Sequence, residues 1–413
     1  MAKILFTNAR LVKVDQDKLQ AGYCVLVEDN RITAVAQEPL VCDDATVIDV
    51  GGKTLMPGLI DAHAHVTGLT LSPKNINSPP AEIFIAAAKY LKNSLMSGFT
   101  TVREAGGADH VLAQMLNKGE IIGPRLFYSG KALTETGGGA DFRQPDEAFD
   151  PCGHIGPFSV MSAIADGVPE VRRAAREELR KGATQLKVFV SGGVVFPSKA
   201  HATLYEYSMD ELCAIVEEAN ARETYVMAHV YTDVGVRRCL QAGVRSIEHA
   251  NFISEETVDL MAESGACYDP TFISLVQRIE SATETGLSPQ IVENLKTTTA
   301  AGQQVYQWAK ARDVPIGFGT DLWGPQAQAE QLREFEMRKD IDTPANILAS
   351  ATHVNAFIMQ QTGKLGCITE GAYADILIVE GDPLSDWRVM VDYQHNLKLI
   401  MKDGVIYKNE LTS

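Results

Sequence analysis

The sequence lacks the features of nucleic-acid-binding, membrane and disulfide-rich proteins. Its 53 aspartates and glutamates outnumber 37 lysines and arginines, which gives a formal charge of −16 and disfavours binding to phosphate backbones. No apolar run approaches the roughly 20 residues that a membrane helix needs. The 7 cysteines are scattered and form no C-x-x-C pair, so they predict neither a disulfide framework nor a thiolate zinc site. We therefore expect no nucleic-acid and no membrane partner.

The amino-terminal segment also lacks the pattern of an export signal. Its apolar run is short, and Asn8, Arg10 and Lys13 interrupt it. An odd number of scattered cysteines is typical of reduced thiols, so we expect a cytoplasmic protein. A chain of 413 residues, 45% of them hydrophobic, can bury the core of one large α/β domain or of two unequal ones. No segment identifies an oligomer interface, and assembly as a homo-oligomer stays open.

Three sequence textures follow one another along the chain. Residues 1–56 contain short β-type runs separated by turns, and the same texture returns from Gly363 onward. Between them, short apolar runs alternate with longer amphipathic segments, which is typical of βαβ units around a parallel sheet. We predict an α/β fold with a (β/α)8 TIM barrel over 57–360 and one small β-sandwich domain built from 1–56 and 361–413.

Several apolar runs end in residues that can bind metals, as expected at the carboxyl ends of barrel strands. His63 and His65 close the strand-like segment GLIDAHAH, and residues i and i+2 of a strand share one face. His229 and His249 lie in VMAHVY and RSIEHA, one strand–helix–strand step apart, which predicts neighbouring strands. Each histidine alone is more often structural, but four in such positions are hard to attribute to packing. Imidazole favours zinc, copper, nickel or iron over calcium and magnesium.

Two further residues extend this histidine cluster. Asp321 follows the apolar run VPIGFGT, where it could cap a helix, or ligate a metal and act as general base. Lys187 lies inside the β run QLKVFV, where burial disfavours an ammonium group and lowers its pKa. A neutral lysine can capture carbon dioxide, and the resulting carbamate can bridge two cations. Without the other candidate ligands, Lys187 would be interpreted as snorkelling or as paired with an acid.

The motifs around these residues resemble the amidohydrolase superfamily over almost the whole chain. The resemblance implies a distorted (β/α)8 barrel with a flanking β-sandwich. Taken together, the motifs are very specific for this superfamily. They are MPGLIDAHAH at 56–65, LKVFVSGG at 186–193, AHVY at 228–231, EHA at 248–250, GTD at 319–321 and GCITEGAYADILIVEGDPL at 366–384.

The resemblance also implies two divalent metals, which we expect to be zinc. His63 and His65 would bind the more buried metal, and the other histidine pair the more exposed one. Lys187, carrying a carbamate derived from carbon dioxide, would bridge both metals. Asp321 would complete the first site and act as the catalytic base. The predicted ligands are His63, His65, Lys187, His229, His249 and Asp321.

Within the superfamily, the chain is similar to the prolidase-like and imidazolonepropionase-related branch. The segments TTVREAGG, TETGGGADFR and AHVYT carry this similarity. It implies hydrolysis of an amide or peptide bond next to a free carboxylate, by a hydroxide that bridges the two metals. The expected substrate is a small molecule, either a dipeptide such as Xaa-Pro or an N-acyl amino acid. Related sequences usually carry His-Gly where this chain has Gly139-Ala140, so one substrate contact is either missing or supplied by another loop.

Four residues are candidates for contacts to the substrate. Tyr231 lies two residues after His229, so the strand register turns it toward the same site. It could bond to the substrate carbonyl or a carboxylate, or it could be an aromatic at the barrel rim. Arg143 lies in a Gly-rich loop, and Lys199 and His201 follow the fourth predicted strand. Each of these three could hold a free carboxylate.

Three other functions fit the same scaffold to different degrees. Cyclic-amide hydrolases of the hydantoinase, dihydroorotase or imidazolonepropionase type share these motifs, and the sequence does not separate them. Deaminases characteristically carry a glutamate three residues after the histidine of strand five, where this chain has Thr232. They also lack the buried lysine. A non-catalytic protein on a degenerate scaffold would have lost ligands, whereas all six positions are intact here.

Overall fold

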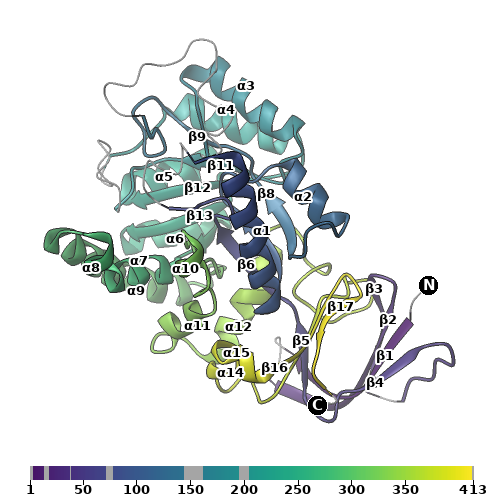
Figure 1. Ribbon diagram of the computed structural model, residues 1–413. Coiled ribbons are helices and arrows are strands. Elements are labelled where there is room, and N and C mark those ends of the chain that lie inside the picture. The colour runs from purple at the N-terminus through teal and green to yellow at the C-terminus, as the bar shows by residue number, and fades with distance from the viewer. Residues whose placement is uncertain are drawn as a thin grey trace.

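The two ends of the chain share one eight-stranded sheet. The computed structural model describes residues 3–13, 18–37, 39–70, 78–143, 161–194 and 204–411. Strand β15 pairs antiparallel with β5, and this joins the carboxyl-terminal strands to the amino-terminal ones. Figure 1 shows β17 of the carboxyl-terminal part in the same region as β1 to β5. The sheet is formed by β1 (Lys3–Lys13), β2 (Lys18–Glu28), β3 (Arg31–Ala36), β4 (Thr46–Asp49), β5 (Thr54–Pro57), β15 (Ile376–Val379), β16 (Leu397–Lys402) and β17 (Val405–Asn409).

Between the chain ends, all the strand pairs that form sheets are parallel. A three-stranded sheet runs in the order β6-β7-β8, and a six-stranded sheet in the order β10-β9-β11-β12-β13-β14. Every residue of β6 and β7 is buried, which is typical of parallel strands covered on both faces. The strands are β6 (Leu59–Ala64), β7 (Phe99–Glu104), β8 (Arg125–Tyr128), β9 (Ala132–Thr134), β10 (Ser162–Ile164), β11 (Leu186–Phe189), β12 (Val226–Thr232), β13 (Ser246–Phe252) and β14 (Cys267–Asp269).

An irregular segment, 316–321, lies in space between β14, the last strand of the larger sheet, and β6 of the smaller sheet. Ile316 forms an isolated parallel bridge with Tyr268 of β14. The amide of Ala62 donates to the carbonyl of Phe318 over 2.9 Å, and the amide of Asp321 donates to the carbonyl of His63 over 2.7 Å. The sequence predicted a regular strand here. The chain instead departs from extended geometry at Asp321, whose φ is +51°.

Helices separate most of the parallel strands, as the alternating texture predicted; β8 and β9 follow one another without a helix. The four amphipathic segments that the sequence indicates, 84–97, 168–181, 208–222 and 291–312, overlap α1, α3, α4 and α9. The helices are α1 (Pro80–Met96), α2 (His110–Asn117), α3 (Gly167–Arg180), α4 (Met209–Asn220), α5 (Asp233–Ala242), α6 (Glu255–Ser264), α7 (Phe272–Glu280), α8 (Ala282–Thr285), α9 (Pro289–Lys310), α10 (Pro325–Gln328), α11 (Arg333–Arg338), α12 (Pro344–Ala349), α13 (Asn355–Ile358), α14 (Arg388–Val391) and α15 (Tyr393–Asn396).

The largest core forms where the helices pack on strands β11 to β13. Val188, Ala228 and Ile247 of these strands are fully buried and belong to one apolar cluster with residues of the helices, such as Ile215 and Val236. This packing fixes the strands and leaves their carboxyl ends to carry polar side chains. None of the helices in the described parts of the chain is both long and apolar enough to cross a membrane.

Candidate metal centre

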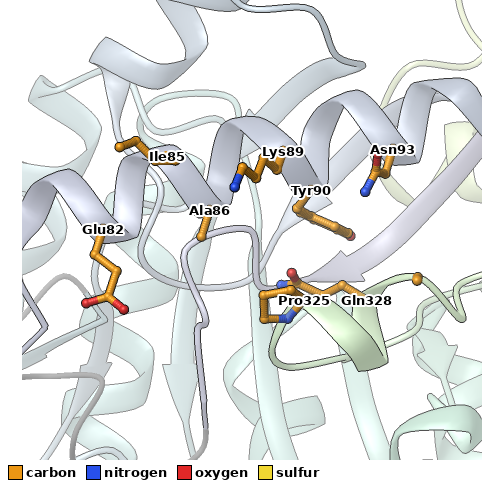
Figure 2. Close-up of a pocket in the computed structure, with 9 residues that line it drawn as sticks. Glu82, Ile85, Ala86, Lys89, Tyr90, Asn93, Pro325 and Gln328 are labelled. Atoms are coloured by element: carbon orange, nitrogen blue, oxygen red, sulfur yellow. The ribbon is translucent and has the colours of Figure 1, made fainter.

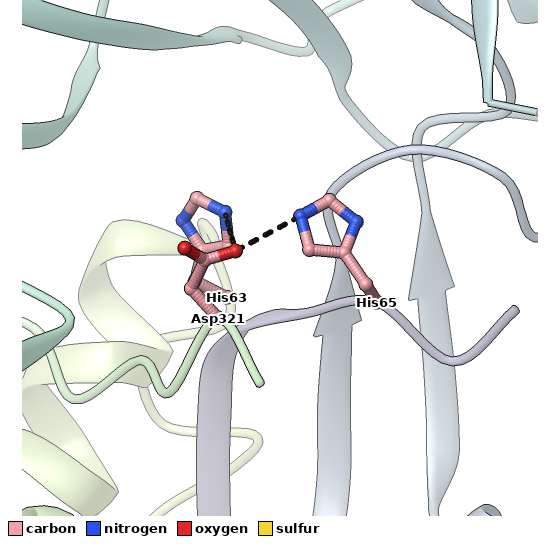
Figure 3. A group of neighbouring side chains, drawn as sticks. All are labelled: His63, His65 and Asp321. Carbon is pink, nitrogen blue, oxygen red and sulfur yellow. Dashed lines mark ion pairs between the residues drawn. The ribbon is translucent and has the colours of Figure 1, made fainter. Parts of the chain in front are cut away.

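Two predicted ligands at the end of β6, His63 and His65, lie close to a third, Asp321, which is distant from them in the sequence. The rings of His63 and His65 have centroids 5.4 Å apart. Oδ1 of Asp321 lies 3.7 Å from Nε2 of His63 and 3.2 Å from Nε2 of His65 (Figure 3). One potential ligand atom from each residue lies within 4.8 Å of the other two. This spacing would allow one cation to contact all three side chains.

Asp321 is held firmly in this position. Besides its contact with His65, its Oδ1 accepts a hydrogen bond from Nε1 of Trp323 over 3.1 Å, and its Oδ2 accepts one from the Ser274 hydroxyl over 3.0 Å. Burial alone would raise the pKa of Asp321. The hydrogen bond with His65 and the nearby charge of His63 outweigh that effect and hold the pKa well below the usual carboxyl value. Asp321 is therefore an anion at neutral pH.

The glycine of the GTD motif lets segment 316–321 approach the site this closely. A Cβ atom at Gly319 would lie 2.5 Å from Cβ of His63 and 2.4 Å from Oδ2 of Asp269. Both distances are shorter than any normal contact between such atoms. Only a glycine therefore allows the chain to pass between these two residues and present Asp321 to the histidines.

The second histidine pair lies on neighbouring strands, as the sequence predicted. Strands β12 and β13 pair in parallel, and the rings of His229 and His249 have centroids 4.6 Å apart. The ring of His249 also lies 5.1 Å from that of His63, so the two histidine pairs form one cluster. Nδ1 of His249 forms a hydrogen bond of 2.7 Å with the Thr271 hydroxyl, which fixes the ring and turns Nε2 into the cluster.

Lys187 is buried at the edge of this cluster. It lies on β11, which pairs with β12, and only 1% of its surface is exposed. Burial lowers the pKa of its ammonium group to about 8, although Glu248 and Asp321 favour the charged form. Its positive charge in turn helps to lower the pKa values of His63, His229 and His249.

Four buried nitrogen atoms in the cluster make no hydrogen bond within the described parts of the chain. They are Nδ1 of His65, Nε2 of His229, Nε2 of His249 and Nζ of Lys187. A buried polar atom without a partner costs about 1–3 kcal/mol, so this group of atoms needs an explanation. Cations that accept electron pairs from His229 and His249, and from an oxygen added to Lys187, would satisfy three of the four. The residues present therefore fit a metal centre.

Arg103 and Glu248 form a buried ion pair that supports His63, and the sequence did not predict this role. Oε2 of Glu248 lies 2.7 Å from Nδ1 of His63, and both carboxylate oxygens of Glu248 accept from Nη2 of Arg103, over 3.1 and 3.2 Å. Burial opposes ionisation of Glu248, but Arg103 and His63 outweigh it and lower its pKa. An anionic Glu248 holds the Nδ1 proton of His63 and leaves Nε2 free for a metal. Two charged residues inside buried β runs, TTVREAG and SIEHA, were the available signal.

The predicted substrate contacts have different surroundings. Tyr231 lies in the cluster, since its ring stacks on that of His249 with centroids 5.0 Å apart and an interplanar angle of 9°. Arg143 is instead engaged by Asp141, through hydrogen bonds of 2.8 Å from Nε and 2.7 Å from Nη2. This local pair reduces the positive charge that Arg143 can offer to a substrate. Lys199 and His201 lie outside the described residues.

The departure at Gly139-Ala140 lies in a buried loop after β9. The amide of Gly139 donates to Oε1 of Glu206 over 2.6 Å, and the carbonyl of Ala140 accepts from the Ser162 hydroxyl over 2.7 Å. A side chain at position 139 would approach Glu206 to 3.1 Å. The loop is thus held by hydrogen bonds between its backbone and the side chains of Glu206 and Ser162. The side chain of Ala140 offers no polar group to a ligand.

A cavity of about 400 Å³ lies apart from the histidines, between α1 and α10 (Figure 2). Its lining includes Tyr90 of α1 and Gln328 of α10. Nε2 of Gln328 donates to the carbonyl of His65 over 2.8 Å, and the Tyr90 hydroxyl accepts from Gln331. The cavity contains none of the predicted ligands. Gln328, in the wall of this cavity, thus supports the segment that carries His65 from the side away from the predicted ligands.

Comparison with known proteins identifies the family. Residues 54–407 match the model of the amidohydrolase family. Ochratoxinase from Aspergillus niger is 31% identical over 373 residues, which cover 86% of this chain and 75% of the relative. The solved structure of an amidohydrolase has a TM-score of 0.95 and 41% identity, and covers 99% of this chain and 100% of its own.

A second solved structure is that of a prolidase complexed with N-methylphosphonate-L-proline. It has a TM-score of 0.94 and 37% identity, with 99% of this chain and 100% of that chain covered. The superfamily resemblance that the motifs indicated, including its prolidase-like branch, is confirmed. The chain therefore belongs to the amidohydrolase family and is a hydrolase that acts on carbon–nitrogen bonds.

Proposed function

We propose that this protein is a binuclear metal-dependent hydrolase that cleaves an amide or peptide bond next to a free carboxylate. The observation that carries this proposal is the single cluster of four histidines, Asp321 and the unpartnered Lys187 at the ends of parallel strands. The proposed ligands of the two cations, expected to be zinc, are His63, His65, Lys187, His229, His249 and Asp321.

Lys187 would act as a ligand only after modification, because an ammonium group has no electron pair to donate. Its pKa of about 8 leaves a useful neutral fraction near neutral pH. The neutral amine can add to carbon dioxide and form a carbamate, whose two oxygens can contact two cations at once. Since Nζ has no hydrogen-bond partner in the described chain, no hydrogen bond has to be broken for this addition.

Bound divalent cations would supply Lewis-acid activation of the scissile carbonyl and of the attacking water. Asp321, an anion fixed by Ser274 and Trp323, would accept the proton of that water. It would then return the proton to the departing nitrogen, so that a neutral amine leaves. Tyr231, stacked on His249, would bond to the substrate oxygen.

The relatives favour a substrate with a free carboxylate. The prolidase structure holds a proline derivative, and N-methylphosphonate-L-proline contains the carboxylate of proline. A dipeptide, Xaa-Pro among others, or an N-acyl amino acid is therefore the proposed substrate class. A deaminase is disfavoured, because the position where it would need an acidic side chain is occupied by Thr232. The Thr232 hydroxyl accepts from the amide of Gly235 and caps α5.

The proposed scaffold is a distorted (β/α)8 barrel at 57–360, with a β-sandwich domain from 1–56 and 361–413. Hydrogen bonds from segment 316–321 to β6 support one seam of this barrel. At the other seam, the amide of Thr184, which precedes β11, donates to the carbonyl of Tyr128 in β8 over 2.8 Å. The sheet shared by the chain ends supports the second domain.

A substrate panel tests this function. Zinc-reconstituted protein is incubated with Xaa-Pro, Xaa-Arg and Xaa-Phe dipeptides, N-acyl amino acids, hydantoins and dihydroorotate, each with and without a chelator. We expect release of a carboxyl-terminal amino acid from at least one linear amide, loss of that activity with chelator and recovery with zinc. Turnover of a ring substrate alone would move the assignment to the cyclic-amide hydrolases. Activity that survives metal removal would contradict the metal-dependent mechanism.

A further inference from the structure

One face of α7 lines the metal centre along its length. Thr271, which precedes the helix, bonds to His249 through its hydroxyl. Ser274 in the first turn bonds to Asp321. Arg278 lies four residues later, so it shares the face of Ser274. Three successive positions on one side of this helix therefore face the proposed centre.

Arg278 has the environment of a binding residue rather than of a surface arginine. Only 8% of it is exposed, yet within the described parts of the chain it forms no ion pair and its Nη1 makes no hydrogen bond. Its Nη2 donates a long hydrogen bond of 3.4 Å to the Ser274 hydroxyl. A guanidinium buried without a carboxylate loses hydration that nothing in the chain replaces.

No anion in the described chain forms an ion pair with Arg278, so its positive charge could be balanced by an anionic ligand. Arg278 interacts electrostatically with Asp321 and with Tyr231. Asp321 forms no ion pair with Arg278 in the described chain; its Oδ1 contacts His65 and Trp323, and its Oδ2 accepts from Ser274. The Tyr231 hydroxyl carries no charge at neutral pH, since burial raises its pKa above the usual value. The other buried arginine near the centre, Arg103, is by contrast fully paired with Glu248.

We propose that Arg278 is the anchor for the free carboxylate of the substrate. This inference rests on the proposed function and names the residue that gives it specificity. A guanidinium presents two parallel N–H donors, which match the two oxygens of a carboxylate. Held there, the substrate would place its amide between Tyr231 and Asp321. Arg143, the candidate from sequence, already holds Asp141.

The test compares alanyl-proline with alanyl-prolinamide, which lacks only the charged carboxylate, or the corresponding pair for the best substrate of the panel. For the unaltered protein we expect a strong preference for the acid. In Arg278→Met we expect KM for the acid to rise about 10- to 100-fold, the range of a lost charge-assisted hydrogen bond, while kcat/KM for the amide changes little. Arg278→Lys should recover part of the loss, since it restores charge without the fork.

Arg333→Met is the matched control. Arg333 of α11 pairs with Glu280 at the end of α7, over 2.8 Å, so its loss disturbs the same helix without touching the buried guanidinium. It should keep the preference for the acid. Titration of proline into chelated protein gives a readout without catalysis, and Arg278→Met should weaken that binding by a similar factor.

Two results would overturn the role of Arg278 while leaving the hydrolase itself intact. One is equal turnover of acid and amide by the unaltered protein, which needs no variant to fold. The other is an equal fall in kcat on both substrates in Arg278→Met, which would assign Arg278 to positioning Ser274 and Asp321. Absence of any chelator-sensitive hydrolysis in the panel would instead contradict the proposed function.

Discussion

Replacing Lys187 by alanine is expected to lower kcat/KM by about 10³-fold or more. The carbamate would be the only ligand from the protein that both cations share, and the loss of several kcal/mol of stabilisation from such a centre corresponds to a factor of this size. Lys187→Ala breaks no hydrogen bond, because Nζ of Lys187 makes none within the described chain. The variant should therefore fold with fewer bound metal equivalents.

Chemical rescue distinguishes this role from a structural one. Acetate or propionate, added with zinc, can occupy the space left by the side chain and supply two oxygens. We expect it to restore part of the activity of Lys187→Ala and none of the activity of a metal-free protein. Lys402→Ala is the control, since Lys402 is also a buried lysine but donates to the carbonyl of Gly123, far from the ligands in sequence and fold. Full activity of untreated Lys187→Ala would refute the bridging role.

Asp321→Asn is the second change with a large expected effect. Asparagine has nearly the same shape, and its single carbonyl oxygen can still accept from Trp323 while its NH2 group faces the Ser274 hydroxyl, which can accept instead of donate. It cannot carry a proton from water to the leaving nitrogen. Removal of a general base typically costs about 10²- to 10⁴-fold, and the lost negative charge also weakens the metal site. Steady-state kinetics on the best dipeptide, with metal content measured in parallel, checks this expectation.

The control for Asp321→Asn is a carboxylate of similar environment outside the site. Asp342 accepts from Nζ of Lys310 and from the Tyr306 hydroxyl, each over 2.6 Å, and these two contacts make it a structural anion. Asp342→Asn should lower thermal stability and leave kcat/KM almost unchanged. If both variants lost activity in proportion to stability, Asp321 would have no catalytic role.

The ligand cluster could be predicted from the sequence because its members lie at the ends of recognisable strands. The i, i+2 spacing of His63 and His65 and the strand–helix–strand step between His229 and His249 are local patterns that survive folding. The structure brings these histidines together. The alternation of strands and helices, and the return of β texture at the carboxyl end, similarly indicated the parallel sheets and the shared terminal sheet.

What the sequence could not indicate depends on contacts between distant segments. Arg278 belongs to FISLVQRIE, where an arginine looks like the polar side of an amphipathic helix, and only the packing of α7 buries it. The pairing of Arg143 with Asp141 depends on loop geometry, which residue types alone do not specify. The last predicted strand, 316–321, is irregular because its backbone contacts both β14 and β6. Both strands are distant from this segment in the sequence, so the sequence around it does not specify these contacts.

The number of divalent cations that each chain binds tests the central claim most directly. Protein is stripped with a chelator, reconstituted with zinc and bicarbonate, freed of unbound metal by gel filtration and analysed by mass spectrometry. A centre built from four histidines, Asp321 and a modified Lys187 predicts two equivalents of zinc per chain. One equivalent would contradict the binuclear centre and the bridging lysine, and none would contradict the metal-dependent mechanism as a whole.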